Sequence, residues 1–214
     1  MNKIQLHNVV PEIFANREDL CSDIWHNEFC FEQGKTYLIK AASGTGKSSL
    51  CSYLYGQRGD YRGVISFDNE DIASYNTNRW CEIRQRHISV LFQDLKLFGE
   101  LTALENIEIK NNITHHKSLK EIELLFEELG IGDKIHSRTD RMSFGQQQRV
   151  ALIRALCQPY NFILLDEPIS HLDDRNSDTM RDILLREVRS NGASLIATSI
   201  GKHMNIDYDI CLNL

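Results

Sequence analysis

The chain has six cysteines but no C-x-x-C pair, and it has no long apolar run. The missing pair argues against a zinc ribbon or thioredoxin-type redox chemistry, and scattered thiols are typical of a reducing compartment. No stretch approaches the roughly 20 apolar residues that a membrane-spanning helix needs. The opening MNKIQLHNVV also lacks the apolar core of a signal peptide. We therefore expect a cytoplasmic chain with no direct membrane insertion.

The chain has no excess of positive charge either. It carries 24 Lys and Arg against 30 Asp and Glu, for a formal net charge of −6. General nucleic-acid binders are usually basic, so we expect no nucleic-acid partner, although a local basic patch stays open. The hydrophobic share of 42% and the length of 214 residues predict a folded chain, 1–214, forming a single domain.

Short apolar segments alternate with helical patterns along the chain. Alternating polar and apolar side chains predict strands of an early β-rich layer at 3–10, 23–31 and 63–70. Compact apolar runs predict the strands of a mostly parallel sheet at 35–41, 86–92, 161–168, 193–199 and 207–214. Helical patterns fill the block from about 95 to 158, which we expect to be a helical insertion. The alternation predicts an α/β fold.

A glycine-rich turn, AASGTGKSS at 41–49, follows a predicted strand and opens a predicted helix. Gly44 and Gly46 let the backbone bend so that successive N–H groups point into one concavity. Lys47 is expected to reach the β- and γ-phosphates of a nucleotide, and Ser48 to give its hydroxyl to Mg²⁺. The alternative, a flexible Gly/Ser turn, fits the strand–turn–helix context less well. The predicted phosphate-binding residues are Ser43, Gly44, Thr45, Gly46, Lys47, Ser48 and Ser49.

Two adjacent acids, Asp166 and Glu167, end a predicted buried strand in FILLDEP. A Mg²⁺ ion beside a triphosphate needs a carboxylate, and an attacking water needs a base. We expect Asp166 to act on the metal and Glu167 on the water. Two acids at a strand end can also be no more than a solvated terminus, a reading that the preceding phosphate loop disfavours.

Five segments occur in the order found in ATP-binding cassette ATPases: ASGTGKSS, FQDLKLFGELTALENI, MSFGQQQRVALIRAL, LLDEP and SHLDD. The chain resembles this family from about residue 3 to its C-terminus. The sequence of these segments is most similar to that of the short cassettes of lipoprotein-release, macrolide-export and cell-division complexes. Amino-acid importers share much of the same sequence. The resemblance implies a P-loop NTPase core with a mostly parallel sheet, an antiparallel β layer and an inserted helical sub-domain.

The segment MSFGQ raises the question of a second anion site. Ser143 followed by Gln146 predicts a capping box at a helix start, where N–H groups lack partners. The resemblance implies that two cassettes pair head to tail with ATP between them. Ser143, Gly145 and Gln146 would then face the γ-phosphate bound by the other subunit, and Asp173 of SHLDD would act across the same interface.

Two further roles come from the resemblance. Gln93 follows a predicted strand, like the glutamine that senses Mg²⁺ and faces the membrane subunit. An aromatic residue near the N-terminus usually stacks on adenine, and Phe14 is the candidate. The alternative for Phe14 is simple packing.

Three positions depart from the family pattern. Ala41 stands where the loop pattern has glycine, which alanine tolerates if its φ is negative. Phe144 stands where the signature segment of the family, MSFGQ in this chain, has glycine. Ser199 occupies the place of the usual histidine after the last core strand, so the resemblance makes Ser199 a candidate catalytic residue; His203 lies four residues later. We expect slow basal ATP hydrolysis unless His203 or the membrane partner supplies the missing group.

The resemblance implies a subunit that binds and hydrolyses ATP with Mg²⁺ and powers a separate integral membrane permease through ATP-driven homodimerisation. Such a subunit lies peripherally at the inner face of the cell membrane. One alternative is an ATP-binding switch or scaffold with very weak hydrolysis. Another is a non-transport cassette of DNA repair or the ribosome, but the chain has neither a long coiled coil nor a second cassette.

Overall fold

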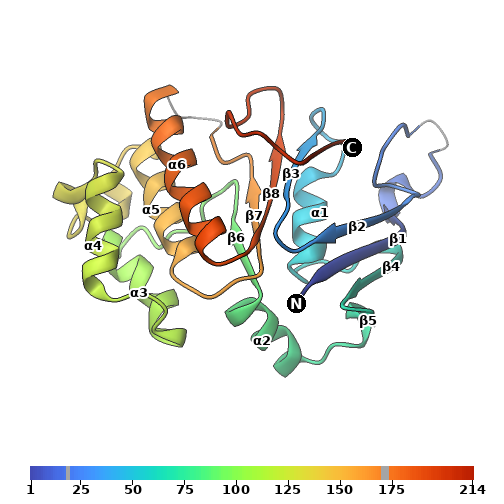
Figure 1. Ribbon diagram of the computed structural model, residues 1–214, viewed down its shortest axis with the longest axis horizontal. Coiled ribbons are helices and arrows are strands. Elements are labelled where there is room, and N and C mark those ends of the chain that lie inside the picture. Colours follow the sequence, from blue (N-terminus) through green and yellow to red (C-terminus); the bar gives the residue numbers. More distant parts are fainter. Residues whose placement is uncertain (18–19, 170–173) are drawn as a thin grey trace.

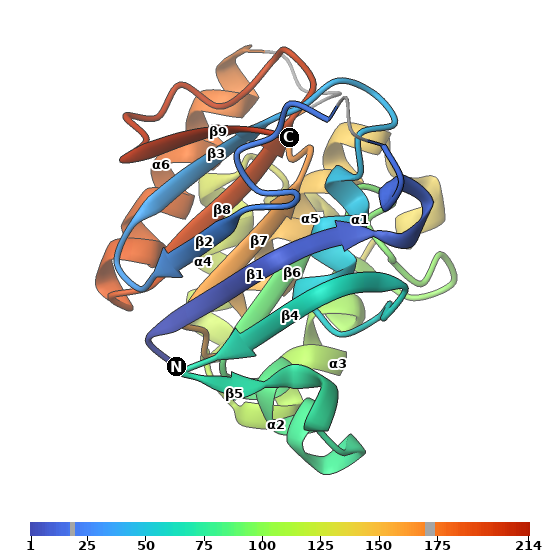
Figure 2. The ribbon, with the colours of Figure 1, turned by 90° about the vertical axis from the view of Figure 1, so that its right-hand side faces the viewer.

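The computed structural model describes residues 1–17, 20–169 and 174–214 (Figure 1). Its strands form two sheets. The antiparallel sheet has the order β2-β1-β4-β5, and the parallel sheet has the order β6-β7-β8-β3-β9. Figure 2 views the antiparallel sheet face on, with the parallel sheet behind it. The predicted fold class, an α/β fold with a parallel sheet and an antiparallel layer, is confirmed.

The parallel sheet forms from the compact apolar runs. Its strands are β3 (Thr36–Lys40), β6 (Ile88–Leu91), β7 (Phe162–Asp166), β8 (Ser194–Ser199) and β9 (Ile210–Asn213). Every residue of β6, β7 and β8 is buried, as expected for strands covered on both faces. Because the strands are parallel, the loops that follow β3, β6, β7 and β8 emerge at one edge.

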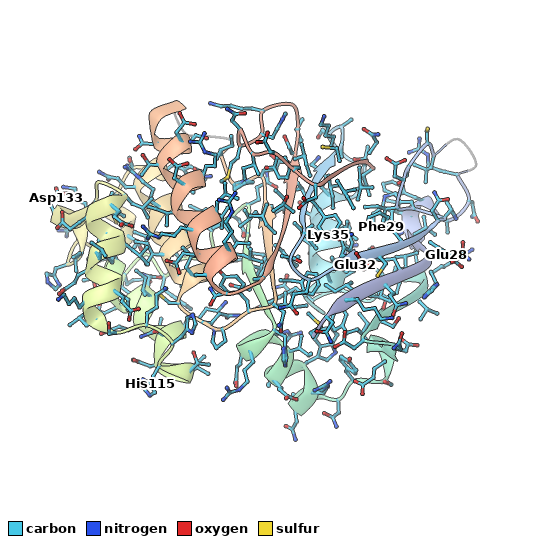
Figure 3. All side chains as sticks on the ribbon, in the orientation of Figure 1. Glu28, Phe29, Glu32, Lys35, His115 and Asp133 are labelled. Atoms are coloured by element: carbon cyan, nitrogen blue, oxygen red, sulfur yellow. The ribbon has the colours of Figure 1, made fainter. Side chains whose placement is uncertain are left out.

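The antiparallel sheet consists of β1 (Lys3–Pro11), β2 (Glu28–Glu32), β4 (Tyr61–Phe67) and β5 (Glu70–Asp71). The expected strand at 23–31 is wrong in its first half. The Ser22 hydroxyl accepts the N–H groups of Ile24 and Trp25, which bends the chain into turns before β2. After β2 the chain turns into β3, and Lys35 Nζ lies 2.5 Å from Glu32 Oε2 in this turn (Figure 3).

The helices are α1 (Lys47–Leu54), α2 (Thr77–Arg86), α3 (Ala103–Thr114), α4 (Leu119–Glu128), α5 (Phe144–Leu156) and α6 (Asp174–Ser190). In Figure 1, α3, α4 and α5 lie at the end of the molecule opposite β1 and β4. These three helices are the ones expected between 95 and 158. The sequence analysis missed α2, a polar helix whose one buried residue is Ile83.

Local signals mark the end of one helix and the predicted start of another. Helix α4 ends at Glu128, Leu129 is its C-cap, and Gly130 follows with a φ of 65°. Helix α5 begins at Ser143 with a complete capping box, in which Ser143 and Gln146 exchange hydrogen bonds. Among the residues that the structure describes, no helix has the length and apolar character needed to cross a bilayer.

Candidate functional site

The loops at the carboxyl edge of the parallel sheet surround a cleft of about 400 Å³. Most of the predicted phosphate-loop residues line it, and so do the candidates from three other segments. These residues are Phe14, Ser43, Gly44, Gly46, Lys47, Ser48, Ser49, Gln93 and Glu167. The fold therefore brings together side chains that lie more than 150 positions apart in the sequence.

The glycine-rich loop has a backbone conformation at two positions that strongly favours glycine. Gly44 and Gly46 have φ values of 80° and 98°. A Cβ atom on Gly46 would also lie 3.2 Å from the Trp25 ring and 3.3 Å from the Phe14 ring. Trp25 Nε1 donates to the Thr45 carbonyl at 3.0 Å, so this buried ring supports the loop from beneath.

Ala41 adopts no positive φ, so the departure from glycine is accommodated. Its N–H donates to the Ser199 carbonyl at 3.1 Å, which joins the loop to the end of β8. Thr45 closes the loop from within by donating its hydroxyl to the Ala42 carbonyl at 2.9 Å. One hydrogen bond thus anchors the loop to the end of β8, and the other holds the loop closed on itself.

Lys47 lies at the floor of the cleft and is only 5% exposed. Its Nζ donates to the Ala42 carbonyl at 2.9 Å and lies 3.8 Å from Glu167 Oε1. An ammonium has three N–H donors, so this geometry leaves capacity for further anionic acceptors. A charge in a poorly solvated place attracts a phosphate more strongly than one in bulk water.

The two acids are linked through Thr198 of β8. The Thr198 hydroxyl donates to Asp166 Oδ1 at 2.8 Å and accepts the Glu167 N–H at 3.3 Å. Asp166 is buried, whereas Glu167 lines the cleft. Glu167 has a φ of 53°, a left-handed conformation that costs a residue with a side chain about 1–3 kcal/mol. The turn thereby directs the Asp166 carboxylate toward the Thr198 hydroxyl and the Glu167 carboxylate into the cleft.

All three predicted magnesium-binding residues meet in an adjoining cleft of about 450 Å³. Ser48, Gln93 and Asp166 all line it. They offer a hydroxyl, an amide carbonyl and a carboxylate, which are the oxygen donors that Mg²⁺ prefers. Ser48 and Gln93 line both clefts, so a cation held here would lie beside a phosphate held by the glycine-rich loop. The donor set fits Mg²⁺.

The signature residues lie elsewhere on the surface. Ser143 is exposed, and neither it nor Gly145 nor Gln146 lines the cleft of its own chain. The Ser143 N–H donates to Gln146 Oε1 at 3.0 Å, and Gln146 N–H donates back to Ser143 Oγ at 3.3 Å. The role of this helix start across an interface stays a prediction. Asp173 lies outside the described residues.

Neither candidate for the missing histidine enters the cleft. Ser199 is 2% exposed, and its hydroxyl donates to the Lys202 carbonyl at 2.7 Å. The His203 ring is exposed, with Nδ1 3.1 Å from the Gly201 carbonyl oxygen. Ile200 lines the cleft instead, with 46% of its surface exposed. The catalytic role expected for Ser199 has no support from this orientation of its hydroxyl.

Helix α5 is tied to two loops of the site. Arg154 donates to the Leu95 carbonyl and, at 2.7 Å, to the Lys96 carbonyl in the loop that follows Gln93. Gln148 donates to the Pro168 carbonyl just after the acid pair. The sequence analysis missed Arg154, although a cation inside the apolar run VALIRAL was a usable signal. Burial lowers its pKa.

Comparison with known proteins decides the family. The sequence model described as "ABC transporter" matches residues 26–170, more than half of the chain. The chain belongs to the ABC transporter family. This confirms the identification as an ATP-binding cassette, and ATP hydrolysis is the reaction class of such cassettes.

Individual relatives agree with this assignment. An uncharacterised ABC transporter ATP-binding protein of Thermotoga maritima is 32% identical over 183 residues, covering 84% of this chain and 77% of the relative. The macrolide export ATP-binding/permease protein MacB of a Shewanella species is 32% identical over 168 residues, covering 77% of this chain and 26% of the relative. The cassette MJ0796, solved as a dimer, has the same fold, with a TM-score of 0.78 at 24% identity, covering 92% of this chain and 87% of that one.

Proposed function

We propose that this cassette binds ATP with Mg²⁺, closes as a head-to-tail homodimer around two nucleotides, and hydrolyses them to drive a separate integral membrane permease. It would work at the cytoplasmic face of the membrane. The observation that carries the proposal is the meeting of Lys47 and Glu167 in one cleft, beside a second cleft lined by Ser48, Gln93 and Asp166.

Each of these side chains has a distinct task. The loop N–H groups and Lys47 bind the phosphates, and Lys47 balances charge at the γ-phosphate. Ser48, Gln93 and Asp166 would hold Mg²⁺, which neutralises phosphate charge when bound. Glu167 takes a proton from the water that attacks the γ-phosphorus, as the bond to the ADP oxygen breaks. Phe14 supports the adenine end of the cleft.

The link from helix α5 to the site supports coupling between dimer closure and hydrolysis. The helix starts at Ser143, the residue proposed to contact the partner's nucleotide. It also holds the loop after Gln93 through Arg154. A shift of α5 on ATP binding would therefore displace the loop that follows Gln93. The cross-interface roles of Ser143, Gly145, Gln146 and Asp173 belong to this proposal.

An apolar cleft of about 300 Å³ between α2, β6 and α3 supports the permease partner. Ile109 and Ile113 are 46% and 54% exposed at its rim. Lys110 contributes a cation whose ammonium has no hydrogen bond or ion pair with the described part of the chain. Phe92 lines both this cleft and the cleft of Gln93. A helical segment with apolar side chains and a carboxylate fits this surface. The permease part of MacB's name agrees with such a partner.

A second candidate function is an ATP-binding switch with very weak hydrolysis. The observation that favours it is the cleft wall after β8, where Ile200 stands and the Ser199 hydroxyl is turned away. The loss of one donor to developing charge typically lowers a rate by about 10²–10³. Steady-state ATPase measured with and without the co-purified membrane protein separates the two functions.

The primary test is nucleotide binding by calorimetry. Lys47→Ala should abolish binding of Mg-ATP because the main cation of the cleft is lost, while circular dichroism stays unchanged. The matched control is Lys120→Ala, which removes an exposed lysine of α4 and should bind like the parent. Affinity of Lys47→Ala close to that of the parent would contradict the proposed phosphate site.

A further inference from the structure

Arg58 lines the nucleotide cleft, although no sequence motif pointed to it. It follows the end of α1 and faces the cleft together with Phe14 and Ser49. Its side chain is 45% exposed, so it is reachable by a ligand. The question is which part of a nucleotide it would meet.

The guanidinium is held in a fixed position. Nε donates to Asp60 Oδ1 at 2.9 Å, Nη2 donates to Asp60 Oδ2, and Nη1 donates to Ser49 Oγ at 2.9 Å. The Tyr53 ring lies beneath it, 5.5 Å from the ring centroid to the guanidinium carbon. These bonds use three of the five N–H donors of an arginine. Two donors stay available to an anion in the cleft.

Asp60 joins the two walls of this end of the cleft. Its carbonyl accepts the Glu12 N–H at 3.0 Å and the Tyr53 hydroxyl at 3.1 Å. Glu12 begins the short 3-10 helix that carries Phe14, whereas Tyr53 belongs to α1. Asp60 therefore positions Arg58, the Phe14 segment and the last turn of α1 together. Such mutual support favours a ligand site over a loose surface arginine.

Arg58 does not line the adjoining cleft of Ser48, Gln93 and Asp166, where Mg²⁺ is proposed to bind. Ser48 and Gln93 line both clefts, but Ser49 and Arg58 line only the nucleotide cleft. Successive residues of a helix point about 100° apart, so Ser49 faces a different part of the phosphate chain from Ser48. Because a P-loop lysine and the following hydroxyl act at the β- and γ-phosphates and the metal, Ser49 is left with the α-phosphate.

We propose that Arg58 is a nucleotide-binding residue that acts at the α-phosphate. It donates to Ser49 Oγ, and it offers its two remaining N–H groups to the phosphate that Ser49 faces. The inference rests on the proposed function, since it requires a nucleotide in the cleft. ATP and ADP share the α-phosphate, so Arg58 should stabilise both equally, and it should not favour the transition state of hydrolysis.

The test is calorimetric binding of Mg-ATP and of ADP to Arg58→Ala. Both dissociation constants should rise by the same factor, roughly tenfold or more for a lost charge-assisted contact, with the ATP-to-ADP ratio unchanged. The turnover number at saturating ATP should stay within about twofold, while KM rises. Arg62→Ala is the matched control, because it removes an exposed arginine of β4 that does not line the cleft.

Arg58→Lys keeps the net charge and guards against a folding defect in the alanine variant. A single ammonium cannot bridge Asp60 and Ser49 as the planar guanidinium does, so a smaller but equal rise for both nucleotides is expected. Unchanged affinities in Arg58→Ala, or a rise for one nucleotide alone, would overturn the α-phosphate assignment while leaving the proposed function intact. A parent chain that binds neither nucleotide would overturn both.

Discussion

The hydroxyl of Thr198 donates to Asp166 Oδ1 at 2.8 Å, across two neighbouring strands of the parallel sheet. The same oxygen accepts the N–H of Glu167, whose φ is 53°. One hydroxyl thus orients the carboxylate proposed to bind metal and supports the strained turn that carries the proposed base. Its removal is expected to affect both stability and turnover.

Thr198→Val keeps the side-chain shape but removes the donor to a buried carboxylate. Leaving a buried polar group without its partner costs about 1–3 kcal/mol of unfolding free energy, and urea denaturation measures this loss. Thr198→Ser retains the hydroxyl and serves as the matched control. A valine variant that is as stable and as active as the serine variant would show that the hydrogen bond does not support the site.

Glu167→Gln retains the shape of the proposed base but cannot accept a proton. Turnover should fall by the factor of roughly 10²–10⁴ that is typical for loss of a general base, while ATP binding persists. If hydrolysis opens the dimer as proposed, ATP should then hold a dimer that size-exclusion chromatography detects. Steady-state ATPase at the parent level in this variant would assign the base to another residue.

A mixture of two inactive variants tests the proposed role of Ser143 across the interface. Lys47→Ala destroys the phosphate loop of one subunit, and Ser143→Arg destroys the signature helix start of the other. A mixed dimer retains one composite site with an intact phosphate loop and an intact signature. The mixture should therefore recover part of the ATPase activity that each variant lacks alone. Normal turnover by the Ser143→Arg variant alone would contradict this role.

Lys110 should make stability depend on pH. Burial, with the charge of Arg154 nearby, lowers its pKa from 10.5 to about 8, and the thiol of Cys157 opposes this shift. Below pH 8 the folded and unfolded chains both carry the charge, and the folded chain bears the desolvation cost. Between about pH 8 and 10.5 the unfolded chain binds the proton more tightly, so the contribution of Lys110 to stability rises with pH.

Lys110→Met removes this charge and should raise the unfolding free energy at pH 7 by roughly 1 kcal/mol. The gain should shrink as the pH rises toward 10.5, the ordinary pKa of lysine. Urea unfolding of parent and variant at matched pH values measures the difference. Lys120→Met is the control, because its side chain is exposed on α4. An equal gain at all pH values would attribute the effect to packing alone.

Patterns of a few neighbouring residues are enough to predict several elements of the fold and of the candidate site. The glycine-rich turn, the buried strand that ends in two acids, and the capping box of Ser143 and Gln146 are all local signals. The apolar stripe of Met180, Ile183, Leu184 and Val188 likewise determined which face of α6 is buried. Each depends on helix or strand periodicity, or on the conformational freedom of glycine, and these act between near neighbours.

Such patterns did not predict helix α2 or the turns that precede β2. The residues of α2 are mostly polar, so no apolar stripe marks them, and the helix is set by the Asn76 cap and by packing. The segment before β2 alternates like a strand, yet the Ser22 hydroxyl and the buried Trp25 make it a turn. In both segments a local side-chain hydrogen bond, together with the burial of an apolar residue, outweighs the polar and apolar pattern.

Tertiary structure alone decided the remaining functional contacts, because their partners lie far apart in the sequence. Trp25 supports Thr45 from 20 positions away, Thr198 holds Asp166 from 32, and Arg154 holds Lys96 from 58. No local pattern encodes which carbonyl or carboxylate such a side chain will meet. Local sequence patterns predict which residues bind nucleotide phosphate and metal. The parallel sheet, which brings the ends of its strands to one edge, decided that they meet there.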